Sequence, residues 1–143
     1  MKKRLLALVL LIAFCMPFLA ACAHSPSKEV VEQCARDVLQ AVIRKDSASI
    51  RTLANPDYMW YFSDEEMAPY YEQYEKWGIC GGDIFIGSMR LAEWYGNVDY
   101  PAGYGSEAVY EVSIGGLMYE YEIHVVETDA GVGVVFFDLF QLE

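Results

Sequence analysis

The sequence predicts an α+β domain over residues 28–143, in which N-terminal helices pack on one face of an antiparallel four-stranded sheet. Two observations predict this class. Apolar residues recur at helical spacing in the first half of the range and at alternate positions in the second half. Short glycine-containing turns separate the alternating segments, so consecutive strands run antiparallel. Helices followed by such a meander define an α+β fold.

The chain begins with the pattern of an export signal. Basic residues 2–4 precede an apolar run over residues 5–18, which is too short to span a hydrocarbon core about 30 Å thick. The Leu19-Ala20-Ala21-Cys22 segment that follows resembles the lipobox of bacterial lipoproteins. This resemblance implies a signal peptide over residues 1–21 and a diacylglyceryl group on Cys22.

The same resemblance predicts where in the cell the protein is located. Residues 22–27 would form a lipidated tether, and the domain would be held in the cell envelope, on the extracytoplasmic face of a bacterial membrane. An uncleaved N-terminal membrane helix is the alternative interpretation of the same segment.

The chain beyond the predicted signal is strongly acidic. Residues 22–143 contain all 21 acidic residues and only seven of the ten basic ones, which gives a formal charge of −14. Such a charge opposes binding to nucleic-acid phosphates, so we expect no nucleic-acid partner. It also opposes attraction to anionic lipid headgroups, so we expect membrane attachment through the lipid on Cys22 alone. Solubility is a sufficient reason for the charge.

Two helices are expected first. In residues 28–45 the apolar side chains form one wide stripe, with charged side chains elsewhere. Ser25 and Pro26 suit the N-cap and the first helical position. Asp46 suits the cap of a second, shorter helix, which Asn55-Pro56 ends.

An aromatic segment, residues 58–62, leads into a third helix. Ser63-Asp64-Glu65-Glu66 has the form of a capping box, and Gly78 marks the C-terminal end of the helix. Pro69 interrupts the helical pattern, so we expect a single turn there, followed by a helix proper that begins near Ala68.

Four strands are expected in the second half. Their expected ranges are residues 84–95, 107–114, 117–128 and 132–142, with a bulge near Gly87 in the first strand. The glycine-rich residues 96–106 are expected to form a loop. Gly115-Gly116 and Asp129-Ala130-Gly131 are expected to be the hairpin turns.

These turns predict which side chains share a face of the sheet. A two-residue turn at Gly115-Gly116 places Ile114 opposite Leu117, and a three-residue turn after Thr128 places Thr128 opposite Val132. The inner face then collects Ala108, Tyr110, Val112, Ile114, Leu117, Tyr119, Tyr121, Ile123, Val125, Val135, Phe137 and Leu139. The outer face collects Glu107, Glu111, Glu120, Glu122, His124 and Asp138, with Met118, Phe136 and Phe140 among them.

The order of elements resembles the nuclear transport factor two-like fold, also called cystatin-like. It is also similar to a group of uncharacterised bacterial lipoproteins with that fold. Residues 41–53 have the pattern of helix, acidic cap and short helix that begins such domains, and residues 119–140 resemble the closing strands. The resemblance implies a curved sheet that forms a cone with the helices. It does not imply a function, because enzymes, binders and scaffolds share this fold.

Aromatic side chains of both halves are candidates for the wall of a ligand pocket inside the cone. The candidates are Trp60, Tyr70, Tyr74, Tyr110, Tyr119 and Tyr121. If they converge, the pocket is apolar in its body and carries hydroxyl groups, which suits a flat or amphiphilic ligand. The alternative is that these rings fill the cone as core, with their hydroxyls bonded to protein groups.

His124 is the weak candidate for a catalytic residue. Catalytic members of the resembled superfamily, such as ketosteroid isomerases and polyketide cyclases, use an Asp or His inside the cone. In the register above, His124 lies instead on the polar face, opposite Glu107 and beside Phe136, so we favour a solvated His–Glu pair. No metal site or cofactor is expected from the spacing of the acidic residues and cysteines.

Cys34 and Cys80 remain once Cys15 is removed with the signal and Cys22 is acylated. A disulfide between them is compatible with an extracytoplasmic location and would stabilise the fold by about 4 kcal/mol. The alternative is two small buried core residues.

Met118, Phe136 and Phe140 on the outer face are candidates for a homodimer contact or for a docking site of another envelope protein. Scattered exposed apolar residues are the ordinary alternative.

The sequence therefore favours a membrane-anchored, non-enzymatic domain that binds a small apolar or amphiphilic ligand or an envelope protein. A cyclase- or isomerase-type enzyme and a structural lipoprotein are the alternatives.

Overall fold

The computed structural model describes residues 24–81 and 83–143, and the predicted signal and Cys22 lie outside this range. Its helices are α2 (Lys28–Ile43), α3 (Ser47–Leu53), the short 3₁₀ helix η1 (Met59–Phe62) and α4 (Asp64–Lys76). Its strands are β1 (Ile86–Tyr100), β2 (Gly103–Ile114), β3 (Leu117–Thr128) and β4 (Gly131–Gln141), hydrogen-bonded in the order β1-β2-β3-β4. The predicted α+β class is confirmed, because the N-terminal helices contact an open antiparallel meander.

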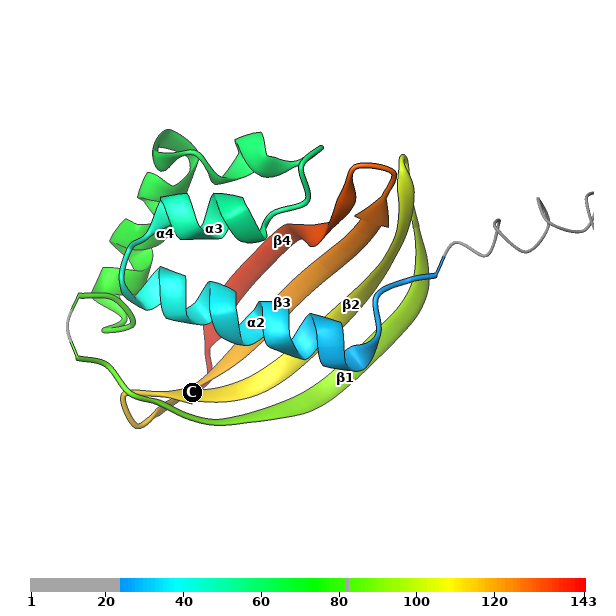
Figure 1. Cartoon of the computed structure of the whole chain (residues 1–143). Coiled ribbons are helices and arrows are strands. Elements are labelled where there is room, and N and C mark those ends of the chain that lie inside the picture. The colour runs from blue at the N-terminus through cyan, green and yellow to red at the C-terminus, as the bar shows by residue number, and fades with distance from the viewer. Residues whose placement is uncertain (1–23, 82) are drawn as a thin grey trace, which may run out of the picture.

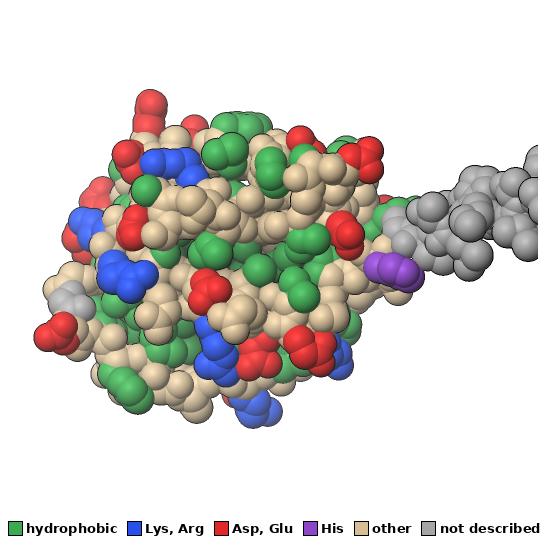
Figure 2. Space-filling view, in the orientation of Figure 1, with side chains coloured by type: hydrophobic (Ala, Val, Ile, Leu, Met, Phe, Trp, Pro, Cys, Tyr) green, Lys and Arg blue, Asp and Glu red, His purple; other side chains and the backbone are tan. Residues whose placement is uncertain are grey.

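The sheet is strongly curved, and α2 lies against its concave face (Figure 1). We call this the inner face and the convex side the outer face. The apolar stripe of α2 packs onto the inner face, and each large apolar side chain buried there stabilises the fold by about 1.5–3 kcal/mol. Asp and Glu side chains are spread over the side of the molecule seen in Figure 2 and are interspersed with Lys and Arg.

The helix caps agree with the sequence at two of three positions. Asp46 accepts a hydrogen bond from the N–H of Ser49 at 3.0 Å, and Ser63 caps α4, both as predicted. The first cap is Ser27, not the predicted Ser25. Ser25 instead donates to Asn97 Oδ1 at 3.0 Å, so it holds the incoming chain against the end of β1.

The predicted break near Pro69 is wrong, because α4 runs without interruption from Asp64 to Lys76. Pro69 is exposed, so water can bond the backbone carbonyl that the missing N–H of proline leaves without a partner.

The predicted loop over residues 96–106 is also wrong. β1 continues to Tyr100, a two-residue turn follows, and β2 begins at Gly103. The glycines here serve close packing: a Cβ on Gly103 would overlap the carbonyl of Glu127, and a Cβ on Gly105 would overlap the ring of Tyr100. The predicted bulge near Gly87 agrees with a register shift between Ile86 and Met89.

The register between β2 and β3 is confirmed, with Ile114 opposite Leu117 and Tyr110 opposite Tyr121. The register between β3 and β4 is confirmed only in part. Thr128 pairs with Gly131, because the turn holds two residues rather than three.

A bulge in β4 restores the predicted pairing further along the strand. Val125 pairs with Val134 and His124 with Phe136, which leaves Val135 as an extra residue in β4. From there Ile123 lies opposite Phe137, as predicted.

The inner face is buried as predicted, with two exceptions. Val134 replaces Val135 in the core because of the bulge, and Val135 is half-buried. Leu117 is exposed because it follows the β2–β3 turn at the rim of the sheet.

Candidate functional site

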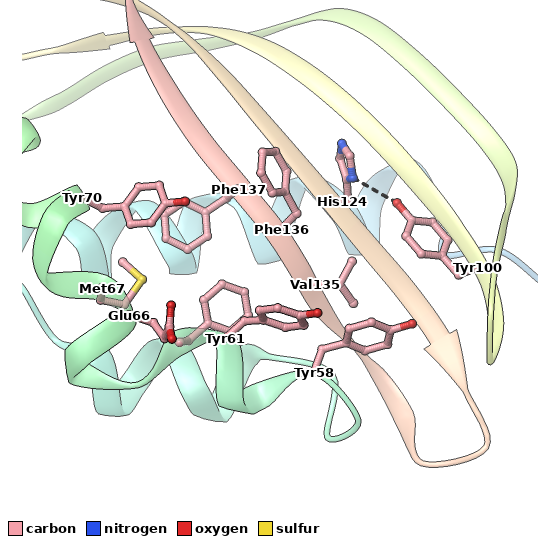
Figure 3. Close-up of a pocket in the computed structure, with 11 residues that line it drawn as sticks. Tyr58, Tyr61, Glu66, Met67, Tyr70, Tyr100, His124, Val135, Phe136 and Phe137 are labelled. Carbon is pink, nitrogen blue, oxygen red and sulfur yellow. Dashed lines mark hydrogen bonds between the residues drawn. The ribbon is translucent and has the colours of Figure 1, made fainter.

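A cleft with a volume of about 380 Å³ opens at the free edge of β4. One wall comes from η1 and α4, and the other comes from β4 and from side chains on the outer face of the sheet (Figure 3). We call it the β4 cleft. Its lining residues are Tyr58, Tyr61, Phe62, Glu66, Met67, Tyr70, Tyr100, His124, Val135, Phe136 and Phe137.

The segment before η1 is fixed to the sheet by Asn55. Its buried side-chain amide donates to the carbonyl of Gly131 at 2.8 Å and to that of Val126 at 3.1 Å. The backbone N–H of Asn55 donates to the carbonyl of Val134. Gly133 allows this contact, because a Cβ there would overlap the backbone of Ala54 and Asn55. The first wall of the cleft therefore stands in a defined position beside β4.

Phe62 and Met67 anchor the first wall to the core. Phe62 stacks on Phe137 with ring centroids 5.8 Å apart, and both Phe62 and Met67 are buried. The Ser63 cap starts α4 directly after Phe62, so Glu66 and Tyr70 fall one turn apart on the side of the helix that lines the cleft.

Three tyrosine hydroxyls at the cleft have no protein partner among the described residues. They belong to Tyr58, Tyr61 and Tyr70. Tyr58 and Tyr61 lie side by side, with ring centroids 6.3 Å apart, and Figure 3 shows both projecting along the cleft. These groups can therefore bond a ligand without first breaking a bond within the protein.

The other end of the cleft is formed by Tyr100 and His124, which contact Glu107 and Glu122; these two carboxylates do not line the cleft themselves. We call the four side chains the His124 cluster. The Tyr100 hydroxyl donates to Glu107 at 2.9 Å and lies 3.0 Å from His124 Nδ1. His124 Nε2 lies 2.8 Å from Glu122 Oε1. Tyr100 reaches His124 across β2 from the end of β1 (Figure 3).

The Tyr100 hydroxyl donates to Glu107, because a carboxylate oxygen accepts. The two ring nitrogens of His124 contact the Tyr100 oxygen and Glu122, with donor and acceptor roles that follow the tautomer of the ring. These contacts fix the orientation of the imidazole within the cluster.

Tyr100 remains a hydrogen-bond donor over a wide pH range. Burial, together with the hydrogen bond to Glu107, raises the pKa of its hydroxyl. Phe136 covers the imidazole of His124 with ring centroids 4.8 Å apart, so only 19% of the His124 side chain is exposed.

His124 lies where the sequence predicts, opposite Glu107 and beside Phe136, on the outer face. It is less solvated than expected, because Tyr100 and Phe136 cover it. The cleft that reaches it lies at the edge of β4 and not among the inner-face tyrosines that were proposed to line a pocket.

The residues proposed to line a pocket inside the cone occupy three different environments. Tyr110, Tyr119, Tyr121 and Tyr74 are buried in the core. The hydroxyl of Tyr119 donates to the carbonyl of Trp77 at 2.9 Å, and that of Tyr121 donates to the carbonyl of Ala35 at 3.1 Å.

Tyr70 and Trp60 are exposed, and the buried Tyr74 contacts β4. Tyr74 donates to Asp138 at 2.9 Å, and Tyr70 lines the β4 cleft. Trp60 does not line the cleft: it stacks on Tyr61 with ring centroids 3.5 Å apart and is 59% exposed.

The sequence interpretation missed Glu66 as a lining residue and Tyr100 as a partner of His124. Tyr100 was missed because its segment was assigned to a loop. The sequence did hold a signal for a strand here. Val98 and Tyr100 alternate as strand residues do, and Pro101-Ala102 directly after them forms the turn.

Cys34 and Cys80 are free thiols in the structure. Cys80 donates to the carbonyl of Val42, which lies eight residues after Cys34 and so about 12 Å further along α2. This separation prevents the disulfide. Burial raises the pKa of Cys80 to about 11 and also raises the pKa of Cys34.

Met118, Phe136 and Phe140 are exposed on the outer face, as predicted. Phe136 belongs to the β4 cleft. Phe140 lines a second hollow of about 270 Å³ between α4 and β4, and Tyr70 separates this hollow from the cleft.

No protein-family model matches the chain, and no curated protein matches it. None of the described helices combines the length and apolar character needed to cross a membrane. Within residues 24–81 and 83–143, no three His, Cys, Asp or Glu side chains are grouped to hold a metal ion.

Proposed function

We propose that this protein is a bacterial lipoprotein with a nuclear transport factor two-like domain that binds a small amphiphilic molecule in the β4 cleft. The observation that supports binding is the composition of the cleft. Its walls are mostly aromatic and apolar, and three tyrosine hydroxyls that bond none of the described protein groups face a hollow of about 380 Å³. Small-molecule sites commonly combine an apolar body of this size with a few polar groups.

The position of the cleft relative to the proposed anchor supports an amphiphilic ligand. Ser25 is bonded to Asn97, and the three residues from Cys22 to Ser25 can span at most about 10 Å. Tyr100 follows three residues after Asn97 on β1, about 10 Å further along the strand. A lipid on Cys22 would therefore hold the Tyr100 end of the cleft close to the membrane, where amphiphiles concentrate.

Binding is tested with N-phenyl-1-naphthylamine, a neutral dye that fluoresces in apolar sites. We expect the full chain carrying Cys22→Ser, which has no sulfur at the proposed lipidation position, to bind the dye. Phe136→Asp places a charge in the cleft wall and should abolish the fluorescence gain. Met118→Asp is the matched control, because Met118 is equally exposed on the outer face and lines neither hollow. Equal fluorescence from the two variants, both folded by circular dichroism, would contradict the proposal.

The anchor is tested separately by metabolic labelling with radioactive palmitate. We expect label in the wild-type chain and its loss in Cys22→Ser, with release of the protein from the membrane fraction. Label retained in Cys22→Ser would exclude Cys22 as the lipidated residue.

A catalytic role for His124 is the second candidate, favoured by the fact that the cleft reaches this residue. It has less support than binding, because both ring nitrogens are bonded to protein groups and none is left for a reacting molecule.

A further inference from the structure

We infer that the ligand of the β4 cleft carries a positive charge, so that it is an amphiphile with a cationic head. This inference rests on the proposed binding function of the cleft. It is drawn from the charges that line the cleft, from the charge of the His124 cluster and from the aromatic faces between them.

No Lys or Arg is among the residues that line the cleft, and Glu66 contributes a carboxylate to its first wall. Arg51 is a basic side chain beside this wall; it donates to the carbonyl of Phe62 and pairs with Asp64 at 3.5 Å. Its charge is therefore already opposed by Asp64. An anionic head entering here would meet Glu66 without a compensating cation.

The end of the cleft beside the His124 cluster is also negatively charged. Glu107 and Glu122 both contact His124, and no other cation pairs with either carboxylate among the described residues. Two carboxylates and at most one imidazolium leave a net negative charge in the His124 cluster. The side chains of Glu107 and Glu122 are 28% and 35% exposed, so water screens their field less than that of a fully exposed carboxylate.

Aromatic rings line the space between the two acidic ends. Tyr58, Tyr61 and Tyr70 present ring faces and edges to the hollow, and Phe136 lies opposite them on β4 (Figure 3). The face of an aromatic ring attracts a cation by about 0.5–2 kcal/mol, and it offers no comparable attraction to an anion. Rings and carboxylates therefore favour the same charge on the ligand.

The test compares three competitors that differ only in their heads. Decyltrimethylammonium and decanoate below their micelle concentrations, and 1-decanol below its solubility limit, are titrated as competitors of N-phenyl-1-naphthylamine bound to the full chain carrying Cys22→Ser. We expect the cation to displace the dye at a concentration at least tenfold below that of decanoate, with decanol between them.

A pair of neighbouring variants locates the effect. Glu66→Gln should reduce the advantage of the cation over decanol severalfold and leave decanol unchanged. Glu65→Gln should change neither value, because Glu65 is exposed on the same helix and does not line the cleft.

The outcomes separate this inference from the function on which it rests. Equal displacement by the three competitors, or preference for decanoate, would overturn the charge inference and leave binding intact. A dye that does not bind at all would overturn the proposed function and the inference with it. A cation preference that Glu66→Gln and Glu65→Gln reduce equally would show that net charge, and not the cleft, selects the head.

Discussion

Tyr119 and Tyr121 lie on the inner face of β3, whereas Tyr58 and Tyr61 lie at the β4 cleft. The two inner tyrosines are fully buried, and each hydroxyl donates to a backbone carbonyl of a helix or its cap. The two cleft tyrosines are partly exposed and keep their hydroxyls free of described protein partners. The difference shows that tyrosine content alone does not indicate a binding site. For these four tyrosines, burial together with the hydroxyl partner separates a structural ring from one available to a ligand.

The largest expected difference between the two groups comes from truncation to alanine. Tyr121→Ala should lower the free energy of unfolding by about 3–5 kcal/mol, because it leaves a cavity among buried residues. Tyr61→Ala should lower it by less than about 1 kcal/mol but weaken dye binding. Urea unfolding of both variants checks this. Equal losses of stability would mean that Tyr61 is as much a part of the core as Tyr121.

Alkaline pH should weaken the core through its tyrosines. Burial raises the pKa of Tyr110 to about 12, whereas an unfolded tyrosine ionises near pH 10. The stabilisation is therefore complete below about pH 10 and is lost as pH rises toward 12, by about 1.4 kcal/mol per pH unit for each such tyrosine. Urea midpoints at rising pH measure the slope. Tyr110→Phe should make the slope shallower, and an unchanged slope would contradict the assignment.

The position of the cleft tyrosines depends on Gly133. Gly133→Ala should cost about 1–3 kcal/mol, because its Cβ would overlap the backbone of Ala54 and Asn55. It should also weaken dye binding by shifting η1 away from β4. Val132→Ala is the control, since Val132 is exposed on the same strand and should change stability by about 0.5 kcal/mol or less. If Gly133→Ala is destabilised but binds the dye as the wild type does, the shape of the cleft does not depend on the contact between Gly133 and Asn55.

The smallest effect concerns the hydroxyls themselves. Tyr121→Phe should cost about 0.5–1.5 kcal/mol through loss of the bond to the Ala35 carbonyl. Tyr58→Phe should leave stability unchanged. A thermal-unfolding comparison of the two variants is sufficient, and a loss in Tyr58→Phe would reveal a structural bond at the cleft.

The core could be predicted from the sequence because local signals determine it. Gly115-Gly116 sets the β2–β3 register, and alternation then assigns Tyr119 and Tyr121 to one face. The caps at Asp46 and Ser63 are equally local. Such features depend on residues a few positions apart.

The cleft could not be predicted in the same way, because it depends on distant contacts. Asn55 bonds carbonyls more than 70 residues away, and Tyr100 reaches His124 across an intervening strand. The glycines at 103 and 105 resemble a loop in the sequence, since their role is visible only against Glu127 and the Tyr100 ring. A pattern of residue types does not report such approaches.

The extra residue at Val135 has a consequence for how this protein can evolve. Val134 and Phe136 already pair with consecutive residues of β3, so a deletion of Val135 would leave every other strand pairing intact. Val135 nevertheless forms part of the cleft wall. Changes of length at this one position therefore offer a lineage a way to alter the molecule it recognises while inheriting the same folded scaffold.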